Sequence, residues 1–160
     1  MVSRLYVMRH GPAGHHGEWR GEDGLRPLTD KGRDAVDTVA VQLVRIGVQL
    51  DAIVTSPLVR AYETADIVAA RFHADDRLAV DDRLSPGFDY QDLESMLDEY
   101  ADATALMIVG HEPDLSGVVA ALIGGARIDY KKGAVARIDL VVAERPAGSL
   151  VWLLTPGSLA

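Results

Sequence analysis

Cysteine is absent from this chain of 160 residues. The protein therefore cannot form a disulfide or a cysteine-rich metal site, and it cannot attack a phosphate ester through a cysteine nucleophile. Long hydrophobic runs are also missing. No segment approaches the length that crosses a membrane, and no basic segment followed by an apolar one opens the chain as a secretory signal would. These absences predict a cytoplasmic protein.

Positive charge is scarce, with 16 Lys and Arg residues against 24 Asp and Glu residues and a formal net charge of −8. Nucleic acids and anionic membranes bind proteins through basic surfaces, so we expect neither as a partner. An anionic substrate would have to be attracted by arginine and histidine side chains placed at its binding site.

The motifs of several other phosphate-binding and metal-binding classes are missing as well. The sequence contains no Walker phosphate loop and no dinucleotide-binding glycine fingerprint, so we predict no cofactor. Asp51 opens a predicted strand but lacks the second aspartate, two positions later, that a haloacid-dehalogenase-type phosphatase needs. Because the histidines have no recognised zinc-ligand spacing, we also predict no metal site.

Length and hydrophobic content predict one domain over residues 1–160, because 48% hydrophobic residues are ample for a single core. Short apolar runs predict buried strands at residues 5–8, 51–55 and 105–109, and each is followed by apolar residues at helical spacing. This order predicts an α/β three-layer sandwich with a mostly parallel central sheet and helices on both faces.

The other segments complete this sandwich. Residues 134–142 and 149–154 are expected to form a C-terminal antiparallel hairpin, residues 78–80 a short strand, and residues 93–100 an amphipathic helix.

Capping residues predict the helix boundaries. Thr29 is the expected N-cap of the first helix, and Gly47 is expected to end it. Ser56 is the expected N-cap of the second helix, with Pro57 at its first helical position, and Pro113 should begin the helix after the third strand.

Cationic and titratable residues follow each of the three best predicted strands. Parallel strands place their carboxyl ends along one edge of a sheet, so residues distant in sequence should converge there. The residues at these strand ends are Arg9, His10, Gly11, Arg60, His111 and Glu112.

These residue types suit phosphoryl transfer. Two arginines can bind phosphate oxygens bidentately and neutralise a doubly charged phosphoryl group. A neutral imidazole can attack phosphorus and form a phosphohistidine, provided that its other nitrogen donates to a carbonyl or carboxylate. The second histidine, close to the phosphoryl charge, should favour its protonated form and donate to that group. This chemistry alone does not decide which histidine attacks.

The motifs together resemble those of the histidine phosphatase superfamily, which has the phosphoglycerate mutase-like fold, and in particular its small SixA-type phosphohistidine phosphatases. The motifs are Arg9-His10-Gly11, Ser56-Pro57-Leu58 with Arg60-Ala61 and Thr64-Ala65, and residues 109–113, supported by Leu28-Thr29 and Gly32. The resemblance spans nearly the whole chain. It implies that His10 is the phosphorylated nucleophile and that Arg9, Arg60 and His111 form the phosphate pocket.

The proton donor is left open by this resemblance, because larger family members take it from an insertion that this chain is too short to contain. Glu112, which we place with Gly11 in the substrate-binding site, is the first candidate, and Asp81 or Asp82 comes second. The alternative for Glu112 is to cap the following helix, where a carboxylate meets the positive end of the helix dipole.

One residue departs from the family pattern, and one loop stands near the site. Glu63 occupies a position where members often carry Gln, and it could pair with Arg60 and soften the charge of the pocket. The loop over residues 12–27 has room to cover the site, and its His15 and His16 are expected to be solvent-exposed.

The sequence therefore predicts a metal-independent phosphatase that passes through a phosphohistidine at His10. A protein phosphohistidine is the expected substrate, and the resemblance is the basis for this. The alternatives are a phosphatase of small phosphomonoesters and a noncatalytic module that binds phosphate or a phosphopeptide.

Overall fold

The fold is a six-stranded mixed sheet covered by helices on both faces, described here from a computed structural model for residues 1–141 and 143–160. The sheet order is β3-β2-β4-β1-β5-β6, with β1 to β4 parallel and β5 and β6 antiparallel. The predicted α/β sandwich and its C-terminal hairpin are confirmed. The strands are β1 (Arg4–Arg9), β2 (Ala52–Thr55), β3 (Leu78–Val80), β4 (Ala105–Gly110), β5 (Val135–Val141) and β6 (Ala147–Leu154).

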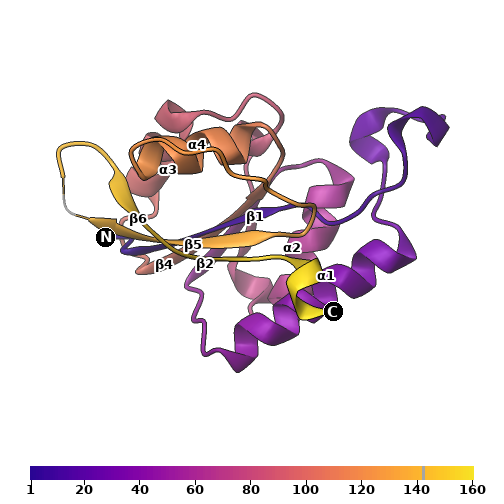
Figure 1. The fold of residues 1–160 in the computed structure, drawn as a ribbon, viewed down its shortest axis with the longest axis horizontal. Coiled ribbons are helices and arrows are strands. Elements are labelled where there is room, and N and C mark those ends of the chain that lie inside the picture. The colour runs from indigo at the N-terminus through magenta and orange to yellow at the C-terminus, as the bar shows by residue number, and fades with distance from the viewer. Residues whose placement is uncertain (142) are drawn as a thin grey trace.

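The helices lie in two layers, with α1 and α2 on one face of the sheet and α3 and α4 on the other (Figure 1). They are α1 (Asp30–Arg45), α2 (Val59–Arg71), α3 (Tyr90–Glu99) and α4 (Asp114–Leu122), with short 3-10 helices η1 (His16–Glu18), η2 (Asp23–Leu25), η3 (Asp75–Arg77), η4 (Asp82–Leu84) and η5 (Pro156–Leu159). The segment between β1 and α1 extends beyond the end of the sheet (Figure 1). Within the described residues, no helix is both long and apolar enough to cross a membrane.

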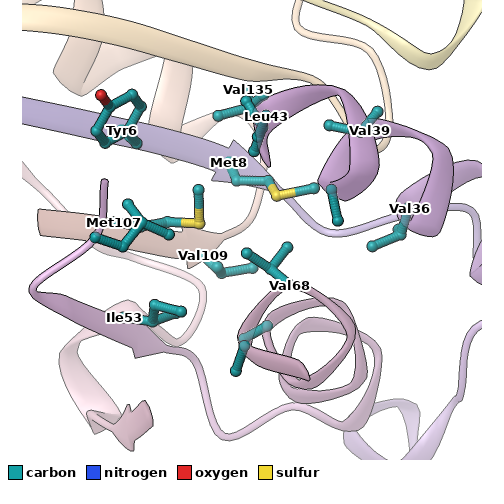
Figure 2. Packing of buried hydrophobic residues seen from close by; sticks show 14 of the residues in the cluster. Tyr6, Met8, Val36, Val39, Leu43, Ile53, Val68, Met107, Val109 and Val135 are labelled. Atoms are coloured by element: carbon teal, nitrogen blue, oxygen red, sulfur yellow. The ribbon is translucent and has the colours of Figure 1, made fainter. Parts of the chain in front are cut away.

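Two hydrophobic clusters explain why the central strands are apolar at every position. Tyr6 and Met8 of β1 pack on one face, whereas Leu5 and Val7 pack on the other, so both side-chain rows of the strand are buried. Figure 2 shows the first face, where side chains of α1 and α2 cover the sheet. The side chains labelled there come from the sheet and from both helices, and they are Tyr6, Met8, Val36, Val39, Leu43, Ile53, Val68, Met107, Val109 and Val135.

The helix boundaries confirm two predictions and correct two others. Thr29 caps α1 by accepting from the Gly32 amide at 2.9 Å, and Gly47 ends the helix with a positive φ of 77°. Ser56 is not an N-cap and Pro57 is not helical, because α2 begins at Val59 with Leu58 as its N-cap, and the Ser56 hydroxyl is hydrogen-bonded to His111 as well as to the Leu58 amide. Pro113 precedes the first residue of α4 and is its N-cap.

The predicted strand over residues 134–142 is observed as β5, and the prediction for its last residue, Val142, lies outside the described residues. The parallel register places Arg9 of β1 beside Gly110 of β4, and Thr55 of β2 beside Val109. Three strands therefore end at the same level, and the residues that follow them lie at one edge.

Candidate active site

The predicted convergence at the sheet edge is observed. The His10 amide donates to the Gly110 carbonyl at 3.0 Å, and the Ser56 amide donates to the Val109 carbonyl at 3.0 Å, so the ends of β1, β2 and β4 are tied together. The imidazole rings of His10 and His111 lie with their centroids 5.3 Å apart. Two histidines separated by about a hundred residues of sequence thus share one site.

His10 is buried, with 7% of its surface exposed, and is held in one orientation. Its Nδ1 lies 2.7 Å from the Gly11 carbonyl, which can only accept, so Nδ1 carries the proton and Nε2 presents its lone pair. Burial is the main cause that lowers the pKa of His10 to about 3; the Gly11 carbonyl opposes this shift, and His111, Arg60 and Arg9 add to it. The imidazole is therefore neutral at pH 7, as a nucleophile must be.

Gly11 connects the turn that follows β1 to two helices, α1 and α2. Its amide donates to the Thr64 hydroxyl at 3.0 Å, and that hydroxyl donates to the Arg60 carbonyl at 2.7 Å in α2. A Cβ on Gly11 would overlap Val36 of α1, so the turn can approach that helix only because the residue has no side chain. The Gly11 amide is thus engaged within the protein, and a role of Gly11 in binding substrate stays a prediction.

Arg60 is also buried, and its charge is matched by a carboxylate that we did not predict. Nη1 donates to the Asp23 carbonyl at 3.0 Å, and Nη2 donates to Asp23 Oδ2 at 3.2 Å. The predicted pairing with Glu63 is wrong. The Glu63 carboxylate instead accepts from the Leu28 amide at 2.8 Å and from Arg33 Nη2 at 2.5 Å, because it faces the start of α1.

Asp23 lies in η2, within the loop expected to cover the site. It also accepts from His16 Nδ1 at 2.8 Å and from Arg26 Nε at 3.1 Å. The hydrogen bond from His16 is the main cause that lowers the pKa of Asp23 to about 2, and Arg26 and Arg60 lower it further. The loop therefore brings a negative charge into direct contact with Arg60.

Arg9 is oriented by a second residue that sequence analysis missed. Its Nη1 donates to the Tyr130 carbonyl at 2.8 Å. Tyr130 is itself buried, and its hydroxyl donates to the Val7 carbonyl and accepts from the Ala136 amide at 3.1 Å. The segment before β5 thus holds Arg9 at the end of β1, and burial lowers the pKa of the guanidinium.

His111 is 4% exposed, and its Nε2 lies 2.8 Å from the Ser56 hydroxyl oxygen. Burial is the first cause that lowers its pKa to about 4; Arg60 lowers it further, Asp23 raises it, and Arg9 lowers it again. A doubly negative phosphoryl group would act in the opposite direction. Protonation of His111 therefore stays a prediction for the substrate-bound protein.

Two of the three candidate proton donors have other hydrogen-bond partners. Glu112 Oε1 accepts from the Ser116 amide at 2.8 Å, which is the capping contact weighed as its alternative. Asp81 accepts from Arg83, and this hydrogen bond is the main cause that lowers the pKa of Asp81. Asp82 is exposed on η4. A proton-donor role stays a prediction for Glu112 and is disfavoured for Asp81.

Three buried side-chain atoms without a hydrogen-bond partner gather at this site. They are the only such atoms among the described residues: Arg9 Nε, Arg60 Nε and His111 Nδ1. Buried polar atoms are nearly always paired in folded proteins, so a cluster of unpaired nitrogens indicates a binding function. In the described part of the chain, no group of three or more His, Asp or Glu side chains is placed to hold a metal ion.

Comparison with known proteins places this site in a family. The family model of the histidine phosphatase superfamily (branch 1) matches residues 5–111, which include both histidines and both arginines. The chain belongs to the histidine phosphatase superfamily. This confirms the resemblance drawn from the motifs, and membership supports a phosphatase, a hydrolase of phosphorylated substrates.

Two relatives match this chain over most of their own length. An uncharacterized protein of Picosynechococcus sp. is 37% identical over 82% of this chain and 81% of its own. The phosphohistidine phosphatase SixA of Escherichia coli is 25% identical over 98% of this chain and 96% of its own. A solved structure of the protein histidine phosphatase SixA complexed with tungstate superposes with a TM-score of 0.87 at 24% identity, covering 98% of this chain and 99% of that one, which shows the shared fold.

Proposed function

We propose that the chain hydrolyses protein phosphohistidine, without a metal, through a phosphohistidine intermediate at His10. The orientation of His10 carries this proposal. Its Nδ1 donates to the Gly11 carbonyl, so the nitrogen that is free to attack phosphorus is Nε2, and its lowered pKa keeps that nitrogen unprotonated.

The unpaired nitrogens supply the second support. Arg9 Nε, Arg60 Nε and His111 Nδ1 belong to groups that can bind phosphoryl oxygens, and a phosphoryl group would provide the acceptors that these atoms lack. The two guanidinium groups can offset the charge that a metal ion offsets in other phosphatases. Arg9, Arg60 and His111 would thus hold the group during its transfer to His10.

The reaction proceeds in two displacements. First, the Nε2 lone pair of His10 forms a bond to phosphorus while the bond from phosphorus to the substrate imidazole breaks, and the electron pair stays on the leaving nitrogen. When the other nitrogen of that imidazole carries a proton, the leaving group is neutral. Second, a water oxygen bonds to phosphorus while the P–Nε2 bond breaks, and the electron pair of that bond returns to Nε2, which leaves His10 neutral. One proton of the water passes to solvent, and inorganic phosphate is released.

This leaving group accounts for the choice of substrate. An alkoxide needs a proton from the enzyme, whereas an imidazole leaves without one, and Glu112 and Asp81 are both held by other hydrogen bonds. The relationship to the SixA phosphohistidine phosphatase supports the same class of substrate.

A substrate panel tests the proposal. The native protein is assayed on a phosphohistidine-containing protein, on glycerol phosphate and on sugar phosphates, each with and without a chelator. We expect the highest kcat/KM on phosphohistidine, no effect of the chelator, and loss of activity in His10→Ala but not in the loop variant His15→Ala. Retained activity in His10→Ala would exclude His10 as nucleophile. Binding of inorganic phosphate with no turnover on any substrate would indicate a binding module instead.

A further inference from the structure

Ser56 lies between β2 and α2 and contacts the second histidine of the site. The residue is fully buried, and its hydroxyl oxygen is 2.8 Å from His111 Nε2 and 3.2 Å from the Leu58 amide nitrogen. The serine that was expected to cap α2 therefore joins the second motif to the third. This contact bears on which nitrogen of the neutral His111 ring is protonated.

The direction of this hydrogen bond follows from counting donors. The Leu58 amide can only donate, so it uses one lone pair of the Ser56 oxygen. If His111 Nε2 also donated, the hydroxyl hydrogen would lack an acceptor, because no acceptor other than Nε2 lies within hydrogen-bond distance of it among the described residues. An unpaired buried hydroxyl hydrogen is costly, so the hydroxyl donates and Nε2 accepts.

This direction leaves the ring proton of neutral His111 on Nδ1. Nδ1 is one of the three buried nitrogens without a partner, beside Arg9 Nε and Arg60 Nε. In the opposite tautomer, Nδ1 would offer a lone pair to the oxygens of a phosphoryl group and repel them. The tautomer thus decides whether this atom attracts or opposes the transferred group.

We propose that Ser56 is a positioning residue that holds neutral His111 with its proton on Nδ1, so that Nδ1–H donates to the phosphoryl group. The role of Nδ1–H in catalysis rests on the proposed phosphatase function, whereas the position of the proton can be tested without it. The lowered pKa of His111 agrees with it, because a histidine that is neutral when substrate arrives depends on its tautomer to act as a donor.

Nitrogen NMR of the imidazole rings tests the tautomer directly. In protein labelled with ¹⁵N on histidine at pH 7, the resonances of His111 are identified by their loss in His111→Gln. We expect a protonated Nδ1 and an unprotonated Nε2 in the native protein, and a change in the Nδ1 resonance when inorganic phosphate is added. In Ser56→Ala, we expect the proton to move largely to Nε2.

Kinetics and a matched control complete the experiment. Ser56→Ala should lower kcat by roughly 10- to 100-fold, which is the range for removing the hydrogen-bond partner of a metal-binding histidine. Thr55→Val removes a neighbouring buried hydroxyl that bonds only to the Ser56 carbonyl, and it should leave both the tautomer and kcat nearly unchanged. Circular dichroism confirms that each variant is folded.

A native His111 protonated on Nε2 would overturn the inference, and so would a Ser56→Ala variant with an unchanged tautomer. Neither result depends on turnover, so the proposed function could fail while the tautomer is confirmed. Conversely, an active phosphatase with the Nε2–H form would keep the function and reject the role of Ser56.

Discussion

Arg60 donates to Asp23 through both terminal nitrogens, to the backbone carbonyl at 3.0 Å and to the carboxylate at 3.2 Å. One anchor is neutral and the other carries charge. Because Arg60 is a candidate phosphate ligand, the Asp23 carboxylate competes electrostatically with a phosphoryl group for the same guanidinium. The loop that holds Asp23 should therefore reduce the affinity of Arg60 for a phosphoryl group.

Asp23→Asn should strengthen the binding of phosphate. The substitution removes the negative charge but keeps the backbone carbonyl and a side-chain oxygen that can hold Arg60 in place. Since the carboxylate is partly exposed, we expect a modest gain, with the inhibition constant of inorganic phosphate falling about two- to fivefold, or roughly 0.4–1 kcal/mol. Competitive inhibition of the phosphatase by phosphate provides the measurement.

Asp37→Asn is the matched control for this prediction. It removes a carboxylate of similar exposure that pairs with Arg71, away from the candidate site, so phosphate inhibition should not change. Weaker phosphate inhibition in Asp23→Asn would show that the carboxylate positions Arg60 rather than competing for it.

His10 should titrate far below an ordinary histidine. Burial lowers its pKa to about 3, so its ring should remain neutral at pH 5, where a free imidazole with a pKa near 6.5 is almost fully protonated. Ring resonances of His10, identified by their loss in His10→Gln, can be followed by NMR from pH 8 to pH 4.5. A midpoint near 6.5 would contradict this and remove the basis for a permanently neutral nucleophile.

The same lowered pKa predicts how stability depends on pH. Between pH 3 and pH 6.5 the unfolded chain binds a proton at His10 that the folded protein does not, so the free energy of unfolding rises with pH through this window and levels off above it. The contribution lost on acidification is on the order of 1 kcal/mol per pH unit. In urea denaturation, the free energy of unfolding of His10→Gln should rise less steeply with pH than that of the native protein. Parallel plots of this free energy against pH would contradict the lowered pKa of His10.

The elements of this fold could be predicted because each carries a local signal. Residues 5–8 and 105–109 are apolar on both strand faces, and Thr29 and Gly47 mark the ends of α1. The register of parallel strands then places Arg9 and its partners at one edge. The predicted strand ends and the parallel order of the strands were therefore sufficient to predict that these residues lie close together.

The partners of the site residues could not be predicted in the same way. Asp23 is one of three acidic residues in an irregular loop, and nothing local distinguishes it from Glu18 and Glu22. Tyr130 reaches Arg9 from 121 positions away. Ser56 next to Pro57 has the pattern of a helix start, and only the tertiary structure places its hydroxyl against His111. Long-range contacts of loop residues leave no periodic trace in a sequence.

Glu63→Gln should have little effect on catalysis. The residue contacts Leu28 and Arg33 rather than Arg60, and glutamine keeps an oxygen for the Leu28 amide while losing the ion pair with half-exposed Arg33. We expect less than about 1 kcal/mol of destabilisation and an unchanged kcat/KM. Glu63→Ala loses both contacts and should destabilise more. A large rise in kcat/KM for Glu63→Gln would indicate that Glu63 does pair with Arg60.

Glu112→Gln separates a capping role from a proton-donor role. Glutamine can still accept from the Ser116 amide, so the fold should be retained, and activity on phosphohistidine should change by less than about threefold if Glu112 is only a cap. A general acid contributes about 10²- to 10⁴-fold. Rates on phosphohistidine and on a phosphomonoester provide the comparison, and a hundredfold loss on both would make Glu112 the proton donor.

Gly32→Ala should disturb both stability and the site, because of where α1 begins. A Cβ on Gly32 would overlap the Pro12 carbonyl, and that carbonyl is fixed by the Thr29 amide at 3.1 Å. Pro12 follows the turn that orients His10, so a shift of Pro12 that relieves the strain would also move the nucleophile. We expect a loss of about 1–3 kcal/mol in the free energy of unfolding together with a lower kcat.

Gly117→Ala is the matched substitution in a second helix. Gly117 lies exposed in α4, a Cβ there meets nothing within 4 Å, and alanine is favoured over glycine in a helix by up to about 1 kcal/mol. In urea denaturation, the free energy of unfolding should therefore fall in Gly32→Ala and rise in Gly117→Ala. Only Gly32→Ala should change kcat. Equal stabilisation of both variants would mean that α1 can move away from Pro12. The close contact between Gly32 and Pro12 would then not be what holds the turn after His10 in place.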